Sequence, residues 1–510
     1  MKFRHASLCV AQAITLAILL PTMGTHEMAL ASTSSVPTPT VSQPPPGTRG
    51  HPFPDTLENL GQAGYVQEEV FIEGTARSFV PVSPMNEIAD GRWNATPTGP
   101  AANYKIRLLI RRPSDAAKFN GTVLVEWLNV SAGFDSDTFD GFGQSFMRAG
   151  YAYVGVSAQA AGVNHLRDKW DPSRYSSLVH PGDSYSYDIF SQAAQSLRAG
   201  SPAPLGNLTN RIKSLIAWGG SQSGARLFTY INSVHPTAAV IAGFVPFIAT
   251  SGAPLSQAPL PVVQMPTGAR AVIRTDSATP VLFELSESEF INAARGIHSQ
   301  ADSEHFRLWE YAGTSHANRI GVDYTMRRLQ ANGIPTGVFP PCGVPPINDL
   351  SDFPVWHAML NAMHVWLQQG KAPRSAPRVE LSIPADVAQQ ASVVRDPGTG
   401  LAKGGIRLPD IAVPTRTLTG TRPAFALKQH PNCALFGAVD PWNGDSDPWD
   451  ADPALDISPK PEPKLAALYG SNASYVKAIK HSADALVAAG FLLESDVQEI
   501  VDAAKKVTIQ

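Results

Sequence analysis

The stretch SLIAWGGSQSGARLF at residues 214–228 has the pattern of a buried strand that turns sharply into a helix. An apolar run ends at two glycines, and a helix-like segment follows. A nucleophilic serine on such a turn usually stands within G-x-S-x-G, because the residues two before and two after it pass close together and must be small. Gly219 and Ser223 hold those places around Ser221. The stretch therefore predicts Ser221 as an exposed nucleophile at the tip of the turn.

Ser223 is the alternative nucleophile in the same stretch. Its neighbours at the same spacing, Ser221 and Ala225, are also small. Glycine tolerates a strained turn best, and the apolar run ends just before Gly219, so we favour Ser221. The main-chain N–H of Gln222, at the start of the helix, would then donate to a developing oxyanion. A Gly/Ser-rich loop without catalysis, or one that binds phosphate, is the competing interpretation.

The chain on either side of this stretch alternates strand-like and helix-like segments. The runs at 121–129, 151–159, 279–286 and 305–313 are short and almost continuously apolar, as buried parallel strands are. The runs at 66–76 and 104–113 instead alternate polar and apolar residues, which is typical of half-exposed antiparallel strands. We expect an α/β protein with a mainly parallel sheet, helices on both of its faces and an antiparallel edge.

Two carboxylates follow one of the later core strands. In this architecture the nucleophile comes first in the chain, then an acid, then a histidine. The strand-like run TPVLFELSESEF at 279–290 ends in Glu287 and Glu289. Comparing it with the common Gly-x-x-Asp form of this loop places Ser286 at the glycine and Glu289 at the aspartate. We therefore prefer Glu289 as the acid and keep Glu287 as the alternative.

A histidine follows the next strand. The run HFRLWEYAG at 305–313 leads through a glycine turn to His316. His305 stands at the wrong end of that strand, and His357 and His364 lie on an amphipathic helical segment where a structural histidine is the better interpretation. We expect His316 to be the general base.

A second oxyanion donor should come from the loop after the run at 121–129. The main-chain N–H groups of Asn129 and Val130 are the candidates there. The stretch N-V-S at Asn129 also matches a glycosylation signal, but a glycan would obstruct this position, so we expect Asn129 to be unmodified.

Six segments together resemble the alpha/beta-hydrolase-domain family with a G-x-S-Q-S turn. The resemblance covers nearly all of the chain beyond residue 50. The resemblance implies the α/β-hydrolase fold and a carboxylic-ester hydrolase, with Ser221 as nucleophile and His316 as base. It does not decide between Glu287 and Glu289. The segments are GTVLVEWLNVSAG (121–133), GYAYVGVSAQAAGV (150–163), GGSQSGARLFTYIN (219–232), SESEF (286–290), EYAGTSHA (310–317) and LYGSNASYVKAIKHSADALVAAGFLL (468–493).

The N-terminal residues resemble an export signal. A basic start precedes an apolar run at 6–20 that is too short for a comfortable membrane span, and ALA at 29–31 fits a cleavage site. We expect residues 1–31 to be a signal peptide cleaved near Ala31, which predicts a secreted or periplasmic protein. In that compartment Cys342 and Cys433, the two cysteines of the mature chain, are expected to form a disulfide.

The rest of the chain divides by composition. Residues 32–50 are rich in Ser, Thr and Pro and predict a disordered or extended linker. Residues 51–370 carry the alternating pattern of the hydrolase core, which ends in a helix stopped by Gly370. Residues 371–510 predict a C-terminal extension packed on the core, with a hairpin near 393–411 and a helical tail from Pro463.

Composition narrows the classes of partner. The formal net charge is −3 over 510 residues without a basic stripe, so nucleic acid and an anionic membrane surface are not expected partners. Two cysteines without a neighbouring CxxC or HxxxH make a poor metal site, and we expect no metal and no cofactor. The best interpretation is a secreted serine esterase that acts on a small-molecule ester through an acyl-enzyme. A peptidase or acyltransferase with the same triad, and a non-catalytic hydrolase-like binding protein, are the alternatives.

Overall fold

The computed structural model of the chain describes residues 35–290, 295–335, 342–384, 391–443, 452 and 454–509. Residues Ser35–Gln510 form one compact unit. The predicted signal peptide at 1–31 lies outside the described residues. In the part of the chain that is described, no helix has the length and apolar character needed to cross a membrane.

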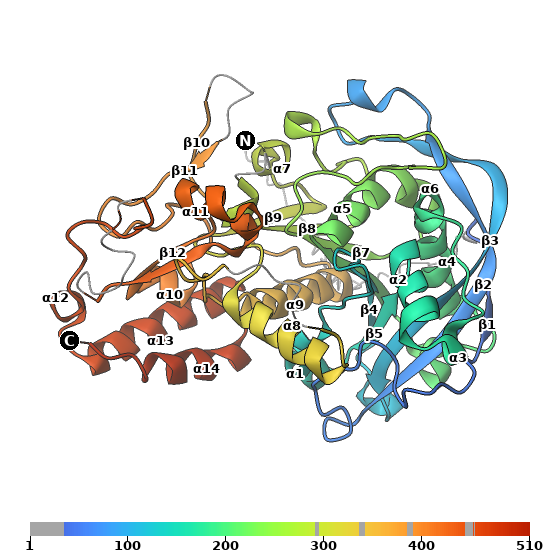
Figure 1. Cartoon of the computed structure of the whole chain (residues 1–510), viewed down its shortest axis with the longest axis horizontal. Helices are drawn as coiled ribbons and strands as arrows, with labels where there is room; N and C mark the ends of the chain where they lie inside the picture. The colour runs from blue at the N-terminus through green and yellow to red at the C-terminus, as the bar shows by residue number, and fades with distance from the viewer. Residues whose placement is uncertain are drawn as a thin grey trace, which may run out of the picture. The chain divides into compact units, whose positions relative to one another are not determined.

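The core of the molecule is a nine-stranded sheet with the order β1-β2-β3-β5-β4-β6-β7-β8-β9 (Figure 1). Strands from β5 to β9 in that order pair in parallel, whereas β1, β2 and β3 are antiparallel to their neighbours. The prediction of a mainly parallel sheet with an antiparallel edge is confirmed. The strands are β1 (Thr40–Ser42), β2 (Tyr65–Pro81), β3 (Ala95–Pro113), β4 (Thr122–Trp127), β5 (Ala152–Val156), β6 (Ser214–Gly220), β7 (Gly243–Phe247), β8 (Val281–Ser286) and β9 (Phe306–Tyr311).

Helices cover both faces of this sheet. Successive residues of a strand point to opposite faces, and β6 uses this alternation to contact both helical layers. The ring of Trp218 packs against Phe142 of α1 (Phe139–Arg148) and Trp356 of α9 (Phe353–Gln369). The next residue, Gly219, lies against Leu227 of α5 (Gln222–Thr229) on the other face. The α/β-hydrolase fold is therefore present with both of its helical layers.

Shorter elements connect and extend these layers. The remaining helices are α2 (Ala160–His165), α3 (Pro172–Tyr175), α4 (Ser186–Ala199), α6 (His235–Ala238), α7 (Arg295–Ser299), α8 (Arg319–Ala331), α10 (Pro409–Ala412), α11 (Ala424–Gln429), α12 (Leu465–Tyr469), α13 (Asn472–Ala489) and α14 (Glu494–Ala504). Two further short helical turns border the site, η8 (Glu287–Phe290) and η9 (Pro431–Phe436). The remaining strands form two small antiparallel pairs, β10 (Leu381–Ser382) with β11 (Ser392–Val393) and β12 (Arg416–Thr419) with β13 (Ala438–Pro441).

The segment after Gly370 packs into the same compact unit as the sheet. Gly370 ends α9 with a φ of 66°, a left-handed conformation that glycine adopts at little cost. An antiparallel bridge joins Arg395 to Ala402 around the glycine-rich turn where the hairpin was predicted. Helices α12, α13 and α14 form the helical tail.

The segment predicted to be a disordered or extended linker is extended and contacts the core. Its strand β1 extends the sheet by pairing with β2, with Val41 opposite Ile72. Farther along, the main-chain N–H groups of Thr48 and Arg49 donate to the Asp171 carboxylate at 2.6 Å and 3.2 Å. These contacts hold residues 40–49 against β2 and the start of α3.

Cys342 and Cys433 form a disulfide whose Cα atoms lie 5.6 Å apart, as the sequence predicted. Cys433 belongs to η9, and both cysteines are buried. The bond therefore joins η9 to the segment that follows residue 341.

Candidate active site

Ser221 stands at the junction between β6 and α5. Its φ of 56° and ψ of −122° lie outside the regions that residues other than glycine prefer, which marks a strained turn. The turn is closed by main-chain hydrogen bonds from Ser221 N–H to the Phe247 carbonyl at 3.0 Å and from Ala225 N–H to the Ser221 carbonyl at 2.9 Å. A Cβ atom at Gly219 would lie 3.2 Å from the main chain of Ser223. The two positions that flank Ser221 therefore do pass close together.

The other serine of the turn faces the interior. Ser223 is 1% exposed, and its hydroxyl donates to the Gly220 carbonyl at 2.9 Å. Its oxygen is thus engaged in holding the turn. Ser221 is the better candidate nucleophile on this geometry.

His316 links Ser221 to one of the two predicted carboxylates. Its Nε2 lies 2.8 Å from Ser221 Oγ, and its Nδ1 lies 2.7 Å from Glu289 Oε1. The loop is fixed by two further contacts, because Glu289 Oε2 accepts from the Ser286 N–H at 2.8 Å and the His316 N–H donates to Ser288 Oγ at 2.9 Å. In this arrangement a neutral imidazole that keeps its proton on Nδ1 can accept the serine proton on Nε2.

Glu287, the alternative acid, points elsewhere. It is fully buried and accepts hydrogen bonds from the N–H groups of Gly313 and Gly420 at 2.9 Å and 3.0 Å. Arg395 pairs with the same carboxylate at 2.6 Å. Glu287 therefore fastens the loop that carries His316 to the C-terminal extension, and does not contact the imidazole.

The predicted oxyanion donors differ in how they are engaged. The main-chain N–H of Asn129 donates to the Ser136 carbonyl at 3.0 Å, so the structure does not leave it free as a donor, contrary to expectation. A short antiparallel bridge between these two residues uses that N–H. The N–H of Val130 has only a long contact of 3.5 Å to the side-chain oxygen of Gln222. Gln222 opens α5, where the first N–H groups have no partner within the helix. Gln222 and Val130 thus remain as candidate donors.

Ser221 and His316 open onto a cavity of about 380 Å³. The cavity is also lined by carboxyl groups that the sequence did not predict, among them Glu126 and Asp352. Burial raises the pKa of Asp352 to about 6, although Asn318 donates to its carboxylate at 2.7 Å. Burial likewise raises the pKa of Glu126 to about 8. Asn318 caps α8 and stands two residues after His316, so Asp352 is tied to the loop that carries the candidate base.

Comparison with known proteins decides the family. The sequence matches the alpha/beta hydrolase domain family over residues 38–502. The chain belongs to this family. No curated protein sequence matches this alpha/beta hydrolase domain.

Solved structures match parts of this alpha/beta hydrolase domain at low identity. The esterase Est22 is 11% identical over 49% of this chain and 72% of its own, with a TM-score of 0.27. A poly(3-hydroxybutyrate) depolymerase from Bordetella parapertussis is 14% identical over 53% of this chain and 88% of its own, with a TM-score of 0.26. Oligopeptidase B from Trypanosoma brucei is 12% identical over 48% of this chain and 33% of its own, with a TM-score of 0.27.

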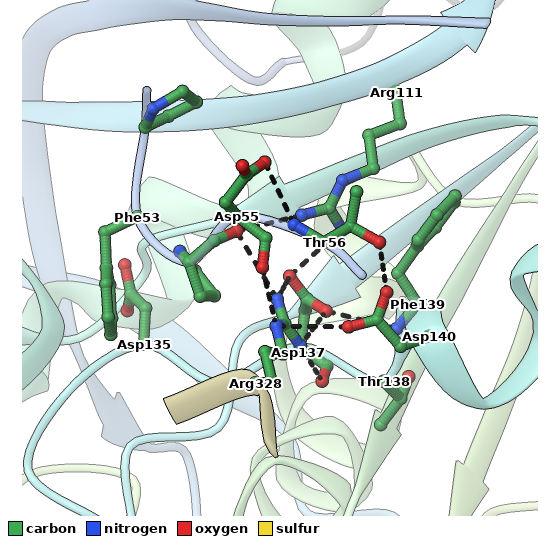
Figure 2. Close-up of polar contacts among 12 residues, drawn as sticks. Phe53, Asp55, Thr56, Arg111, Asp135, Asp137, Thr138, Phe139, Asp140 and Arg328 are labelled. Atoms are coloured by element: carbon green, nitrogen blue, oxygen red, sulfur yellow. Dashed lines mark hydrogen bonds and ion pairs between the residues drawn. The ribbon is translucent and has the colours of Figure 1, made fainter. Parts of the chain in front are cut away.

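A buried network of charged side chains in this alpha/beta hydrolase domain includes Asp137, Asp140 and Arg328 of the cavity lining (Figure 2). Arg328 of α8 makes two bonds to the Asp137 carboxylate, at 2.8 Å and 2.7 Å, and contacts Asp140 at 3.1 Å. Arg111 of β3 reaches Asp137 from the other side at 3.1 Å. Burial alone would raise the pKa of Asp137, but these two guanidinium groups hold that pKa below its usual range.

The network extends to the N-terminal segment. The guanidinium groups of Arg111 and Arg328 both donate to the carbonyl of Pro54, at 3.0 Å and 3.4 Å. The hydroxyl of Thr56 donates to Asp140. The charges of this network are therefore paired with one another, and the network joins four separate parts of the chain, the N-terminal segment, β3, the region of Asp137 and Asp140, and α8.

Proposed function

We propose that this alpha/beta hydrolase domain is a serine hydrolase that cleaves carboxylic esters through an acyl-enzyme. The observation that carries the proposal is the continuous contact from Ser221 Oγ through His316 to Glu289, at the edge of a cavity. Three residues from separate segments meet in the order and at the distances that nucleophilic catalysis by serine requires.

The geometry supports a two-stage reaction. His316 Nε2 takes the proton of Ser221 as Oγ bonds to the ester carbonyl carbon, and Glu289 stabilises the imidazolium that forms. The N–H groups of Gln222 and Val130 are the proposed donors to the oxyanion. The bond from carbon to the alcohol oxygen then breaks, and His316 returns its proton to the leaving alcohol. In the second stage His316 deprotonates a water molecule as its oxygen bonds to the acyl carbon. The bond from that carbon to Ser221 Oγ then breaks, and His316 returns the proton to Oγ, which releases the acid.

Labelling with a fluorophosphonate probe tests the nucleophile. Wild-type protein and the Ser223→Ala variant should react with the probe, whereas Ser221→Ala should not. On p-nitrophenyl esters from acetate to octanoate, Ser221→Ala should lower kcat by about 10⁴-fold or more. Loss of labelling in Ser223→Ala but not in Ser221→Ala would contradict the assignment.

The same assay separates the remaining functions. Faster cleavage of peptidyl p-nitroanilides than of the esters would indicate a peptidase, and transfer of the acyl group to an added alcohol in preference to water would indicate an acyltransferase. Absence of both labelling and turnover in folded protein would favour a binding protein.

We also propose that the protein is exported. The support is the signal-like sequence of residues 1–31 together with the disulfide between Cys342 and Cys433, because disulfides persist mainly in oxidising compartments. N-terminal sequencing of the protein recovered from the periplasm or the medium should find Ser32 as the first residue. Recovery of the protein only inside the cell, with residues 1–31 intact, would contradict export.

A further inference from the structure

We propose that the cavity beside Ser221 selects a neutral ester that carries an aromatic ring, which packs against Phe353 and Trp356. The inference rests on the proposed function of Ser221 and names its class of substrate. It is carried by the aromatic side chains of the cavity, by the glycines that position them and by the charges that surround them.

The aromatic wall is defined as Phe247, Phe353 and Trp356, and all three line the same cavity as Ser221 and His316. The ring centroids of Phe247 and Trp356 lie 5.5 Å apart, and those of Phe353 and Trp356 lie 5.5 Å apart. Phe353 and Trp356 are only partly buried and so have surface left for a ligand, whereas Phe247 is 1% exposed and contacts Trp356. Aromatic rings at such spacing favour a further ring in a tilted or edge-to-face arrangement.

Two glycines position this wall. A Cβ atom at Gly220, directly before the nucleophile, would overlap the ring of Phe247. A Cβ atom at Gly141 of α1 would overlap the ring of Trp356 and would lie 3.0 Å from Phe353. The rings therefore rest directly on main chain at both places. Because their positions are already set, a bound ring would lose little free energy to rearrangement of the wall.

The charges of the cavity favour a substrate without a net charge. Carboxyl groups outnumber cations along its lining, where the guanidinium of Arg328 is already bonded to Asp137 and Asp140. A substrate anion would thus find this guanidinium occupied by carboxylates of the protein. The cavity volume of about 380 Å³ lies near the lower end of the range for small-molecule sites, which suits a compact ester.

Pairs of esters that differ only in the ring test the preference. Methyl benzoate is compared with methyl cyclohexanecarboxylate for a ring in the acyl group, and phenyl acetate with cyclohexyl acetate for a ring in the leaving group. Intrinsic reactivities cancel when the ratio of kcat/KM within a pair is compared between wild type and variant. Trp356→Leu and Phe353→Leu should lower the aromatic-to-saturated ratio of at least one pair by about 3- to 10-fold.

Phe425→Leu is the matched control, because Phe425 is 43% exposed and lies outside the cavity lining. It should leave both ratios unchanged. Ratios that are the same in wild type, Trp356→Leu and Phe353→Leu would overturn the aromatic preference while leaving the esterase proposal intact. Charge is tested with two para-substituted esters, dimethyl terephthalate and monomethyl terephthalate. With kcat/KM expressed per ester group and divided by the rate of alkaline hydrolysis of the same ester, the value for dimethyl terephthalate should be at least about tenfold higher. Equal values would overturn the preference for a neutral substrate.

Binding to the Ser221→Ala variant separates this inference from the proposed chemistry. Calorimetric titration with methyl benzoate and methyl cyclohexanecarboxylate measures the preference without turnover. Tighter binding of the aromatic ester supports the aromatic site even if no ester is hydrolysed by the wild type, an outcome that would refute the proposed function alone. Equal or weaker binding of the aromatic ester would refute the aromatic site.

Discussion

Glu287 and Glu289 leave the same short helical turn, η8, and both are buried, but they contact different partners. Glu289 reaches the imidazole of His316, whereas Glu287 is held by two main-chain N–H groups and Arg395. One carboxylate is thus placed to act on the candidate base, and the other to hold the loop on which that base stands.

Substitution of each glutamate by glutamine should therefore affect a different property of the protein. Glu289→Gln should lower kcat on p-nitrophenyl acetate by about 10³- to 10⁴-fold, because the imidazole loses the charge that orients it and stabilises its protonated form. Glu287→Gln should instead lower the free energy of unfolding by about 1–3 kcal/mol, because Arg395 loses its charged partner. Steady-state kinetics and urea denaturation of both variants measure the two effects. A larger loss of kcat in Glu287→Gln than in Glu289→Gln would contradict the assignment.

Local sequence could predict residue positions but gave only a preference between neighbours, for Ser221 over Ser223 and for Glu289 over Glu287. The spacing after the strands placed Ser221, His316 and the acidic pair, because the end of a parallel strand determines where the next residues lie. Glu287 is bound by Arg395 and Gly420, which lie 108 and 133 residues farther along the chain. No local sequence pattern indicates these partners. The sequence pattern likewise did not predict the antiparallel bridge to Ser136 that uses the Asn129 N–H.

At the scale of elements, apolar runs predicted the parallel strands well because these strands are buried on both faces. The short strand β1 escaped prediction because its composition is rich in Ser, Thr and Pro, and its order comes from pairing with the edge of β2. For α9 the amphipathic pattern predicted a helix but not the partner of each face. Trp356 faces the cavity, and the next residue, His357, contacts Asp496 of α14 at 3.0 Å.

The disulfide connects the short element η9 to a distant part of the chain. Cys433 bonds to a cysteine 91 residues earlier, and Leu435 lines the cavity and accepts a main-chain hydrogen bond from Ala317, next to His316, at 2.9 Å. The disulfide thus fixes a segment that contacts the loop of the candidate base.

Removal of this bond should lower stability. Closing a long loop restricts the unfolded chain, so Cys433→Ser should lower the free energy of unfolding by about 2–4 kcal/mol under oxidising conditions. Urea denaturation measures the loss. The double variant Cys342→Ser/Cys433→Ser is the control and should lose about the same amount, since both changes remove one bond. An unchanged denaturation midpoint in Cys433→Ser would contradict the prediction.

At the scale of the whole molecule, Arg328 joins parts that are distant in sequence. It connects α8 to Asp137 in the loop after β4, 191 residues away, and to Pro54 in the N-terminal segment, 274 residues away (Figure 2). No local sequence pattern predicts these contacts, because each charged residue taken alone has the pattern of an ordinary surface residue. The fold buries them together, and Arg111 completes the pairing of Asp137.

Removing the Arg328 guanidinium should therefore destabilise the entire unit. In Arg328→Met the apolar stem remains, but Asp140 loses its guanidinium partner and Asp137 keeps only Arg111. Breaking a buried ion pair by removing one partner costs about 3–5 kcal/mol. Arg319→Met, on the same helix, is the matched control. Arg319 pairs with Asp323, and the two side chains are 58% and 54% exposed. Exposed ion pairs of this kind contribute at most about 1 kcal/mol to the free energy of unfolding. Urea denaturation of both variants compares the losses. Equal small losses would show that the buried network does not hold the three segments together, whereas a loss confined to Arg328→Met would establish that it does.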